Sequence, residues 1–310
     1  MLSRRQFLAL GAGVCALGAG TGLYAWQIEP YWPELVRRPM PLDGLPADLA
    51  GKTLLQISDI HVGPRVSSEF LMRSFRAMSD LAPDFVAITG DFVSYRTANE
   101  ISELAKVLSV VPRGRLATVA SLGNHDYGRN WRDVAVADRV TRVADDAGVR
   151  VLRNEVHMAN GLQFVGLADF WSPEFGAGHG YPPTGRLIAP AHVEGTGRAA
   201  DARAALRQLA PAQPTVVLSH NPDAQDLPIW DGVRGWVLAG HTHGGQVKPP
   251  FLPPPIVPVR NRRYTAGAFE VGPGRTMYVN RGLGFLIQVR LNVRPELTLF
   301  TLQPGRARSS

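Results

Sequence analysis

The chain has 310 residues, of which 45% are hydrophobic and 19% charged. This composition excludes a disordered chain, and the single long apolar run excludes a protein with many membrane spans. The formal net charge of +7 favours anionic partners such as phosphates or an acidic membrane surface, whereas the lack of any run of five like charges argues against nucleic acid.

Residues 1–28 are predicted to be an export signal or a membrane anchor. Arg4 and Arg5 precede Phe7 and Leu8, and no further charge appears before Glu29. This start resembles a twin-arginine signal, which would pass the chain through the twin-arginine export machinery. The apolar stretch also suffices to span a bilayer, and cleavage is left open. In both cases the paired arginines stay on the cytoplasmic side, so we expect an extracytoplasmic domain, in the periplasm or on the outer face of the inner membrane.

The proline-rich segment 29–50 is predicted to be a linker, and residues 51–305 a single α/β domain. Strands are expected at 54–58, 85–89 and 116–122, with helices at 68–81, 102–110 and 134–147 between and after them. This alternation is typical of βαβ units and a largely parallel sheet. Shorter elements follow: strands at 151–152, 162–167, 216–218, 236–238, 277–279 and 297–302, a helix at 199–209, a lid-like loop at 171–190 and a surface loop at 249–258.

Polar residues follow five of the expected strands immediately. In open α/β sheets functional groups gather beyond the carboxyl ends of the strands, so the five loops are expected to converge on one crevice. The clusters are Asp59-Ile60-His61, Gly90-Asp91, Gly123-Asn124-His125-Asp126, His220-Asn221 and Gly240-His241-Thr242-His243.

The residue types in these clusters are those of a metal site. Asp, His and Asn suit Zn, Mn or Fe, and one carboxylate can bridge two cations. In Asp-x-His and His-x-His an extended backbone would put both side chains on one face. Glycine before Asp91, Asn124 and His241 would let the backbone turn sharply. The only cysteine, Cys15, lies in the N-terminal apolar segment, so thiolate ligands and intrachain disulfides are excluded.

Each cluster taken alone also occurs in ordinary turns. Five of the eight histidines nevertheless fall within the clusters, whereas histidines of an ordinary core would scatter. The other three, His157, His179 and His192, are expected to be structural or lid residues. The conjunction of clusters therefore favours a functional centre over five unrelated turns.

In their order and spacing, these motifs resemble those of the calcineurin-like metallophosphoesterases over about residues 53–302. The segments 218–223, 240–247 and 278–284 are similar to a bacterial branch whose members are often membrane-associated or twin-arginine-exported. The resemblance implies a four-layer α/β/β/α sandwich. It also implies that a first metal is held by Asp59, His61 and His243 and a second by Asn124, His220 and His241, that Asp91 bridges them, and that His125 lies near the leaving group with Asp126 available to orient it.

The expected activity is phosphoester hydrolysis by a metal-bridging hydroxide, with two divalent or trivalent ions of Mn, Fe or Zn. We expect a phosphodiesterase or pyrophosphate-cleaving enzyme of the cell envelope. Its substrate would be a phosphate ester, lipid-linked or nucleotide-containing among the options. One alternative is a UDP-2,3-diacylglucosamine-type pyrophosphatase of lipid A synthesis, although its cytoplasmic substrate conflicts with the export signal. The other alternative is a non-catalytic binding module at the membrane.

Overall fold

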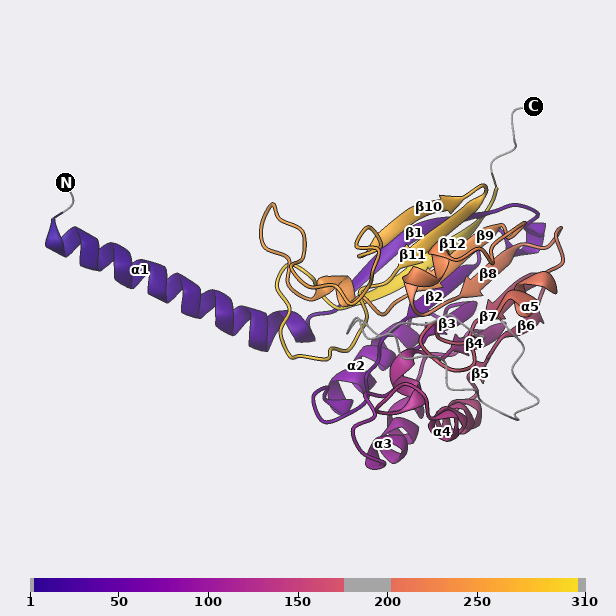
Figure 1. Ribbon diagram of the computed structural model, residues 1–310, viewed down its shortest axis with the longest axis horizontal. Helices are drawn as coiled ribbons and strands as arrows, with labels where there is room; N and C mark the ends of the chain where they lie inside the picture. Colours follow the sequence, from indigo (N-terminus) through magenta and orange to yellow (C-terminus); the bar gives the residue numbers. More distant parts are fainter. Residues whose placement is uncertain (1–2, 176–201, 306–310) are drawn as a thin grey trace.

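The computed structural model describes residues 3–175 and 202–305, and its globular part is built on two facing β-sheets (Figure 1). The strands are β1 Glu34–Leu42, β2 Thr53–Ile57, β3 Phe85–Thr89, β4 Ala117–Ser121, β5 Arg150–Val151, β6 Glu155–Ala159, β7 Leu162–Gly166, β8 Thr215–Leu218, β9 Gly235–Ala239, β10 Gly267–Gly272, β11 Arg275–Val279 and β12 Glu296–Pro304. The helices are α1 Arg4–Leu23, α2 Ser68–Ser79, α3 Asn99–Leu108, α4 Val134–Asp146 and α5 Ala202–Arg207. The strand order is β1-β12-β2-β3-β4-β5 in the first sheet and β10-β11-β9-β8-β7-β6 in the second.

Helices and loops cover the outer faces of both sheets, so the fold has four layers. The helices α2, α3 and α4 pack on the first sheet through an apolar cluster that includes Phe75 and Val140. A second cluster, with Leu54 and Phe164, fills the space between the sheets. A third lies under α5 and the segment around Trp230, on the outer face of the second sheet. The predicted α/β/β/α sandwich is confirmed.

The central strands are apolar throughout because both of their faces are buried. In β3, Phe85 and Ala87 face the second sheet, whereas Val86 and Ile88 face the helices. Strands β2 to β5 are parallel, and so are β7, β8, β9 and β11. Each sheet therefore gathers the carboxyl ends of its parallel strands at one edge, and all five polar clusters leave from these ends.

The strands that the sequence pattern missed are edge strands. The βαβ prediction is confirmed by β2 to β5, but β1, β6 and β10 each pair with a single neighbour. An edge strand buries less surface, so it needs no uninterrupted apolar run. Of the predicted lid loop 171–190, residues 176–190 lie outside the described part of the chain, as do His179 and His192, and residues 199–201 of the predicted helix.

The prediction of a linker at residues 29–50 is wrong over most of this segment. Its central part forms β1, which pairs in parallel with β12 along nine residues. Glu29 is buried, and its carboxylate accepts a hydrogen bond from the Val293 amide. Pro39 and Pro41 made the segment look irregular, but an edge strand tolerates proline because one of its sides needs no N–H donor.

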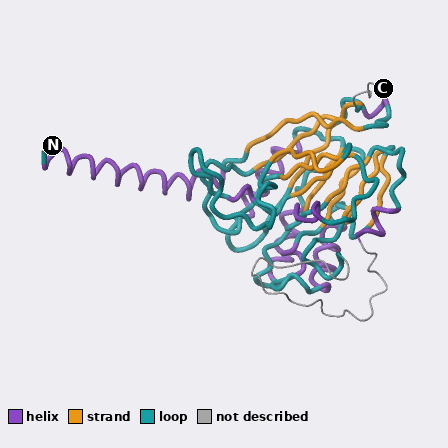
Figure 2. Tube along the Cα trace, turned by 45° about the horizontal axis from the view of Figure 1, so that its top comes forward, coloured by secondary structure: helices purple, strands orange, loops and turns teal. Residues whose placement is uncertain are grey.

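The helix α1 stands apart from the globular body (Figures 1 and 2). Ser3 caps its first turn, and none of its residues is buried. Together with the two short helical segments that follow, it forms a 28-residue span, Arg4–Tyr31, that is long and apolar enough to cross a membrane by length and composition. The predicted signal or anchor therefore has the structure that either role requires, an exposed apolar helix.

Candidate metal centre

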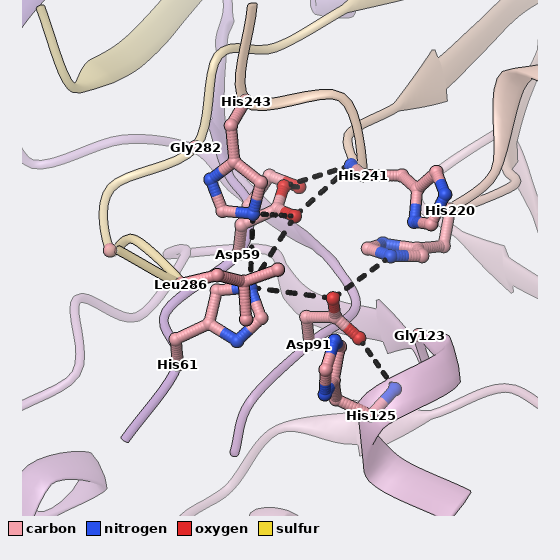
Figure 3. Close-up of polar contacts among 12 residues, drawn as sticks. Asp59, His61, Asp91, Gly123, His125, His220, His241, His243, Gly282 and Leu286 are labelled. Carbon is pink, nitrogen blue, oxygen red and sulfur yellow. Dashed lines mark hydrogen bonds and ion pairs between the residues drawn. The ribbon is translucent and has the colours of Figure 1, made fainter. Parts of the chain in front are cut away.

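The loops after β2, β3, β8 and β9 bring six buried ionisable side chains together (Figure 3). They form two groups of three, and within each group one potential ligand atom of every residue lies within 4.8 Å of the others. The first group is Asp59, His61 and His243, and the second is Asp91, His220 and His241.

The carboxylate of Asp91 lies between the two groups. Its Oδ2 atom is 3.4 Å from His61 Nε2 in the first group and 3.2 Å from His220 Nε2 in the second. Its Oδ1 atom accepts a hydrogen bond of 2.9 Å from the backbone N–H of His125. One oxygen thus faces both groups while the other is held by the chain, as a bridging ligand requires.

In the first group, neutral imidazoles converge on a carboxylate. His61 Nε2 and His243 Nε2 are 3.1 Å apart, and His243 Nε2 is 3.3 Å from Asp59 Oδ1. Burial lowers the pKa of His61 to about 3 and that of His243 well below its ordinary value, so both rings keep free lone pairs at neutral pH. Burial also raises the pKa of Asp59 to about 6. A cation among these atoms would relieve the cost of burying them together.

In the second group, hydrogen bonds to carbonyl oxygens select the histidine tautomers. His220 Nδ1 lies 2.7 Å from the Thr89 carbonyl oxygen, which leaves Nε2 to face Asp91. His241 Nε2 lies 3.0 Å from the Pro258 carbonyl oxygen, which leaves Nδ1 for a cation. Burial lowers the pKa of His241 to about 3. Burial also opposes a charge on His220, but nearby Asp91 outweighs it and raises the pKa of His220.

The amide of Asn124 has the properties of a further ligand. The side chain is buried, and neither Oδ1 nor Nδ2 has a hydrogen-bond partner. A buried polar group left unpaired costs about 1–3 kcal/mol, so an orphaned amide beside the two groups calls for a missing partner. A cation on Oδ1 fits that place, and the nitrogen and oxygen donors of the whole centre suit Mn, Fe or Zn.

The backbone reaches this arrangement through strained conformations. Asp59, His61, Asp91, His241 and His243 all adopt positive φ, between 50° and 68°. The predicted extended Asp-x-His and His-x-His segments are therefore wrong, because left-handed residues turn the side chains toward each other. Such residues cost about 1–3 kcal/mol each and concentrate at functional sites.

Glycines serve these loops in two different ways. Gly90 adopts φ of 78°, so it provides the sharp turn that the sequence predicts before Asp91. Gly240 is needed for space, since a Cβ there would lie 1.9 Å from Ser58 Oγ and 2.3 Å from Asp59 Oδ2. The same holds at Gly123, where a Cβ would meet Asp91 Oδ1 at 2.3 Å.

The two predicted catalytic residues have different surroundings. His125 is half-buried, its ring centroid lies 5.1 Å from that of His61, and its Nδ1 is 3.3 Å from the Ser94 carbonyl oxygen. Asp126 is fully buried and accepts hydrogen bonds from the amides of Gly123 and Val93. Both oxygens of Asp126 thus hold loop backbone, which makes it an anchor of the loop that carries Asn124 and His125.

Sequence reasoning missed several residues around the centre. Asp169 follows β7 as the other clusters follow their strands, is fully buried, and has a pKa raised to about 7 by burial, with the charge of His220 opposing the rise. That position beyond a strand was an available signal. Trp131 stacks on Trp171 at 5.0 Å, and the pair joins the ring of His125 to that of His241. No sequence signal marks this contact, because it crosses from one sheet to the other.

The segment after β11 closes the centre from the other side. The amides of Leu283 and Gly284 donate to the carbonyl oxygens of Ser58 and Asp59. Arg290, fully buried, donates to the carbonyl oxygens of residues 281, 282, 284 and 293 and thereby fixes the path of this segment. The loop that carries Asp59 is therefore supported on both sides.

Two adjoining groups of potential metal ligands, with the Asp91 carboxylate between them, lie at the carboxyl ends of strands in a four-layer sandwich, and this arrangement is that of a metal-dependent hydrolase. The model of one family, calcineurin-like phosphoesterase, matches residues 52–245, and the chain belongs to this family. It is therefore a metal-dependent phosphoester hydrolase.

Several characterised or named proteins are similar along nearly the whole chain. Phosphodiesterase YaeI of Escherichia coli is 31% identical, over 97% of this chain and 100% of its own length. The uncharacterized metallophosphoesterase YkuE of Bacillus subtilis is also 31% identical, over 97% and 98%. UDP-2,3-diacylglucosamine pyrophosphatase LpxG of Chlamydia trachomatis is 26% identical, over 90% and 92%.

Proposed function

We propose that the protein is a phosphodiesterase or pyrophosphate-cleaving enzyme of the cell envelope. The observation that carries the proposal is the position of Asp91 Oδ2, within 3.4 Å of a histidine from each ligand group. In this proposal the first metal is held by Asp59, His61 and His243, the second by Asn124, His220 and His241, and both by Asp91.

This placement gives the surrounding residues their roles in metal binding. Two bound cations of Mn, Fe or Zn would supply the charge that activates a water and neutralises the phosphate oxygens. Asp91 would help to hold both cations, and the depressed pKa of His61 and His241 keeps their ligand nitrogens available at neutral pH. The Pro258 carbonyl and the Thr89 carbonyl hold two histidine rings in the tautomers that ligation needs.

His125 is the residue that we assign to the leaving group. Its Nδ1 lies 3.3 Å from the Ser94 carbonyl oxygen, so Nε2 is the atom that would meet the leaving oxygen. In the imidazolium form, Nδ1–H donates to Ser94 and the Nε2 proton passes to the leaving oxygen, which leaves a neutral ring. Its half-exposed ring sets it apart from the six fully enclosed side chains. Asp126 acts through the loop backbone, since its hydrogen bonds go to Gly123 and Val93.

The proposed preference for diesters or pyrophosphates is supported by similarity to two named relatives and by the net charge of the chain. YaeI is named a phosphodiesterase and LpxG a pyrophosphatase, and both match most of the chain. The net charge of +7 favours an anionic substrate. The twin-arginine-like start and the exposed apolar helix α1 support export or anchoring on the outer side of the membrane.

A substrate panel tests this function. Full-length protein loaded with Mn²⁺, Fe²⁺ or Zn²⁺ is incubated with bis-p-nitrophenyl phosphate, p-nitrophenyl phosphate and a nucleotide pyrophosphate. We expect the diester or the pyrophosphate to be hydrolysed with the highest kcat/KM. Turnover confined to the monoester would contradict the proposal, and binding without turnover of any substrate would favour the non-catalytic module.

The likeness to LpxG favours a second candidate, hydrolysis of UDP-2,3-diacylglucosamine. The same panel separates the two, because that candidate requires the acylated nucleotide to be preferred over simple diesters. Localisation separates them too, since a cytoplasmic nucleotide substrate conflicts with an exported domain. A fusion to a periplasm-active reporter enzyme at Ser310 shows on which side the domain lies.

A further inference from the structure

Exposed large apolar side chains gather at one end of the molecule. In residues 3–175 and 202–305, all of them except Met158 lie on α1, on residues 24–32 that follow it, or on two loops. These are the β9–β10 loop, residues 249–258, and the β11–β12 loop, residues 285–291. A distribution confined to one end indicates a surface rather than chance exposure.

Hydrogen bonds tie the β11–β12 loop to the base of α1 and connect the β9–β10 segment to the β11–β12 loop. In the β11–β12 loop, the Arg290 amide donates to the Ala25 carbonyl at 2.9 Å, and Gln288 Nε2 donates to the Trp26 carbonyl at 3.2 Å. The Lys248 amide, at the start of the other loop, donates to the Leu291 carbonyl at 2.9 Å. Figures 1 and 2 show these loops at the end of the body from which α1 projects.

The large apolar side chains on the two loops are exposed to solvent and therefore stabilise the fold little. Phe251 is fully exposed, with a relative accessibility of 105%, and it adopts φ of 65°, a conformation disfavoured for a bulky residue. Leu252, Ile256 and Ile287 are exposed by 60%, 77% and 64%. Four large apolar groups held out in water on loops fixed by hydrogen bonds point to an apolar partner.

The charges around the loops fit an anionic bilayer. Between Gly244 and Phe269 the sequence contains Lys248, Arg260, Arg262 and Arg263 and no acidic residue. Near α1, the Arg294 guanidinium stacks over the exposed Trp32 ring at 4.1 Å. Basic residues beside exposed aromatic and aliphatic groups suit a headgroup region of negative charge, whereas two such surfaces on two copies of the chain would repel each other.

The geometry of α1 brings this surface to a membrane. Its 20 residues, at about 1.5 Å per residue, match the thickness of a hydrocarbon core. Arg4 and Arg5 mark one end of the span, and Trp26 and Trp32, both exposed, mark the other. The β11–β12 loop, which contacts residues 25 and 26, and the β9–β10 loop beside it would then lie at the level of the lipid headgroups.

The same two loops border the metal centre. The Pro258 carbonyl, at the end of the β9–β10 loop, is 3.0 Å from His241 Nε2. In the segment that leads into the β11–β12 loop, the Gly284 amide donates to the Asp59 carbonyl oxygen, and Ile287, three residues further on, is exposed. The exposed apolar side chains are therefore only a few residues from segments that contact the candidate metal ligands.

We propose that the two loops insert into the headgroup region of an anionic bilayer and hold the metal centre against it, so that the substrate is the phosphodiester or pyrophosphate of a membrane-resident lipid. The assignment of a lipid substrate rests on the proposed function. The insertion of the two loops does not, and it is tested without any measurement of activity.

A fluorescent label reports the insertion. In full-length protein with Cys15→Ser, the variant Phe251→Cys is labelled with an environment-sensitive dye and reconstituted into vesicles of phosphatidylglycerol and phosphatidylcholine. The matched control is Met158→Cys, an exposed apolar position on β6. We expect a blue shift and quenching by headgroup-proximal nitroxide lipids at residue 251 only, stronger than in pure phosphatidylcholine.

Three outcomes would overturn the insertion. Equal emission at residues 251 and 158 would show that both labels stay in water. A blue shift without nitroxide quenching would assign the surface to a protein partner or a second copy. Quenching that does not depend on phosphatidylglycerol would remove the role of the basic residues.

Activity then tests the substrate class. The variant with serine at residues 251, 252, 256 and 287 is compared with wild type on soluble bis-p-nitrophenyl phosphate and on a lipid with a p-nitrophenyl phosphodiester headgroup in the same vesicles. We expect hydrolysis of the lipid to fall by about tenfold or more, since presentation to the centre is lost, while soluble turnover is kept. Equal loss on both substrates would contradict the inference. Failure of wild type on both would instead contradict the proposed function, whatever the quenching shows.

Discussion

The two ends of β3 carry the same kind of residue in opposite roles. Asp84 precedes the strand, and Asp91 follows it. Asp84 is paired within the chain: Oδ2 accepts from the Thr53 amide at 2.8 Å, and Oδ1 from Arg115 at 2.7 Å. Asp91 faces two histidines instead. A buried carboxylate needs positive charge. The amino end of β3 receives it from the protein, whereas we propose that the carboxyl end receives it from bound cations.

The fold is stabilised at the amino end of β3 and strained at its carboxyl end. At Asp84 both carboxylate oxygens have hydrogen-bond partners, and only Ala82, two residues before it, has a positive φ nearby. Around Asp91, five ligand residues have positive φ, and buried polar atoms of Asn124, His61 and His243 have no hydrogen-bond partner. The carboxyl edge therefore carries a cost that the apolar clusters of the four layers must offset.

The largest effect is expected from removing the shared carboxylate. We predict that Asp91→Ala binds fewer than two metal ions per chain, because both ligand groups lose the oxygen between them. We also expect kcat/KM to fall by about 10³-fold or more. Metal analysis with diester hydrolysis measures both. Asp84→Ala is the control, and its folded fraction should keep metal and activity. Two ions still bound in Asp91→Ala would refute the bridging role.

At His125 we expect a loss of turnover without a loss of metal. His125→Ala should keep both metals and lose about 10²–10⁴-fold in kcat, the contribution typical of a positioned acid. The deficit should shrink for a diester with a good leaving group, since such a group needs less protonation. Wild-type kcat in this variant, with every substrate, would rule out the assigned proton transfer.

The tight space at Gly240 should matter for metal affinity. In Gly240→Ala the new Cβ would collide with Ser58 Oγ and Asp59 Oδ2, so the Asp59 side chain must move. We predict a loss of about 10–100-fold in affinity for the first metal, the range seen when ligand support is removed. Titration with Mn²⁺ measures it. Gly13→Ala, which meets nothing within 4 Å, is the control, and equal affinities of the two variants would contradict the argument.

The smallest effect concerns stability alone. Burial raises the pKa of Asp84, but hydrogen bonds from Thr53 and Arg115 outweigh it, so the folded-state pKa lies below the usual value. The stabilisation is thus present at neutral pH and lost as pH falls through the folded-state pKa. At pH 7 the free energy of unfolding of Asp84→Asn should be about 1–3 kcal/mol lower than that of the wild type, in denaturant titrations of the metal-free proteins. This difference should shrink in acid. A difference independent of pH would exclude this origin.

Much of the fold and of the centre was accessible from sequence because local pattern and burial coincide there. The uninterrupted apolar runs of β2, β3 and β4 predict strands buried on both faces, and the polar clusters directly after them predict where ligands lie. β1 was missed since its prolines are compatible only with an edge, and nothing local tells an edge strand from a linker. The stack of Trp131 on Trp171 was equally hidden, because its partners come from opposite sheets.

By itself, the order of residues determined the class of the fold, the seven candidate ligands and the exposed apolar helix at the N-terminus. The α/β class and the five polar clusters follow from periodicity, residue chemistry and the rule that parallel strands end at a common edge. The four-layer sandwich and the choice of seven ligands follow from the resemblance to the calcineurin-like metallophosphoesterases. Only the tertiary structure decided that Asp91 faces both ligand groups, that Asp126 anchors a loop, and that two loops distant in sequence join the base of α1. Such relations depend on how separate segments pack, and the free energy of packing is set by contacts that no local pattern contains.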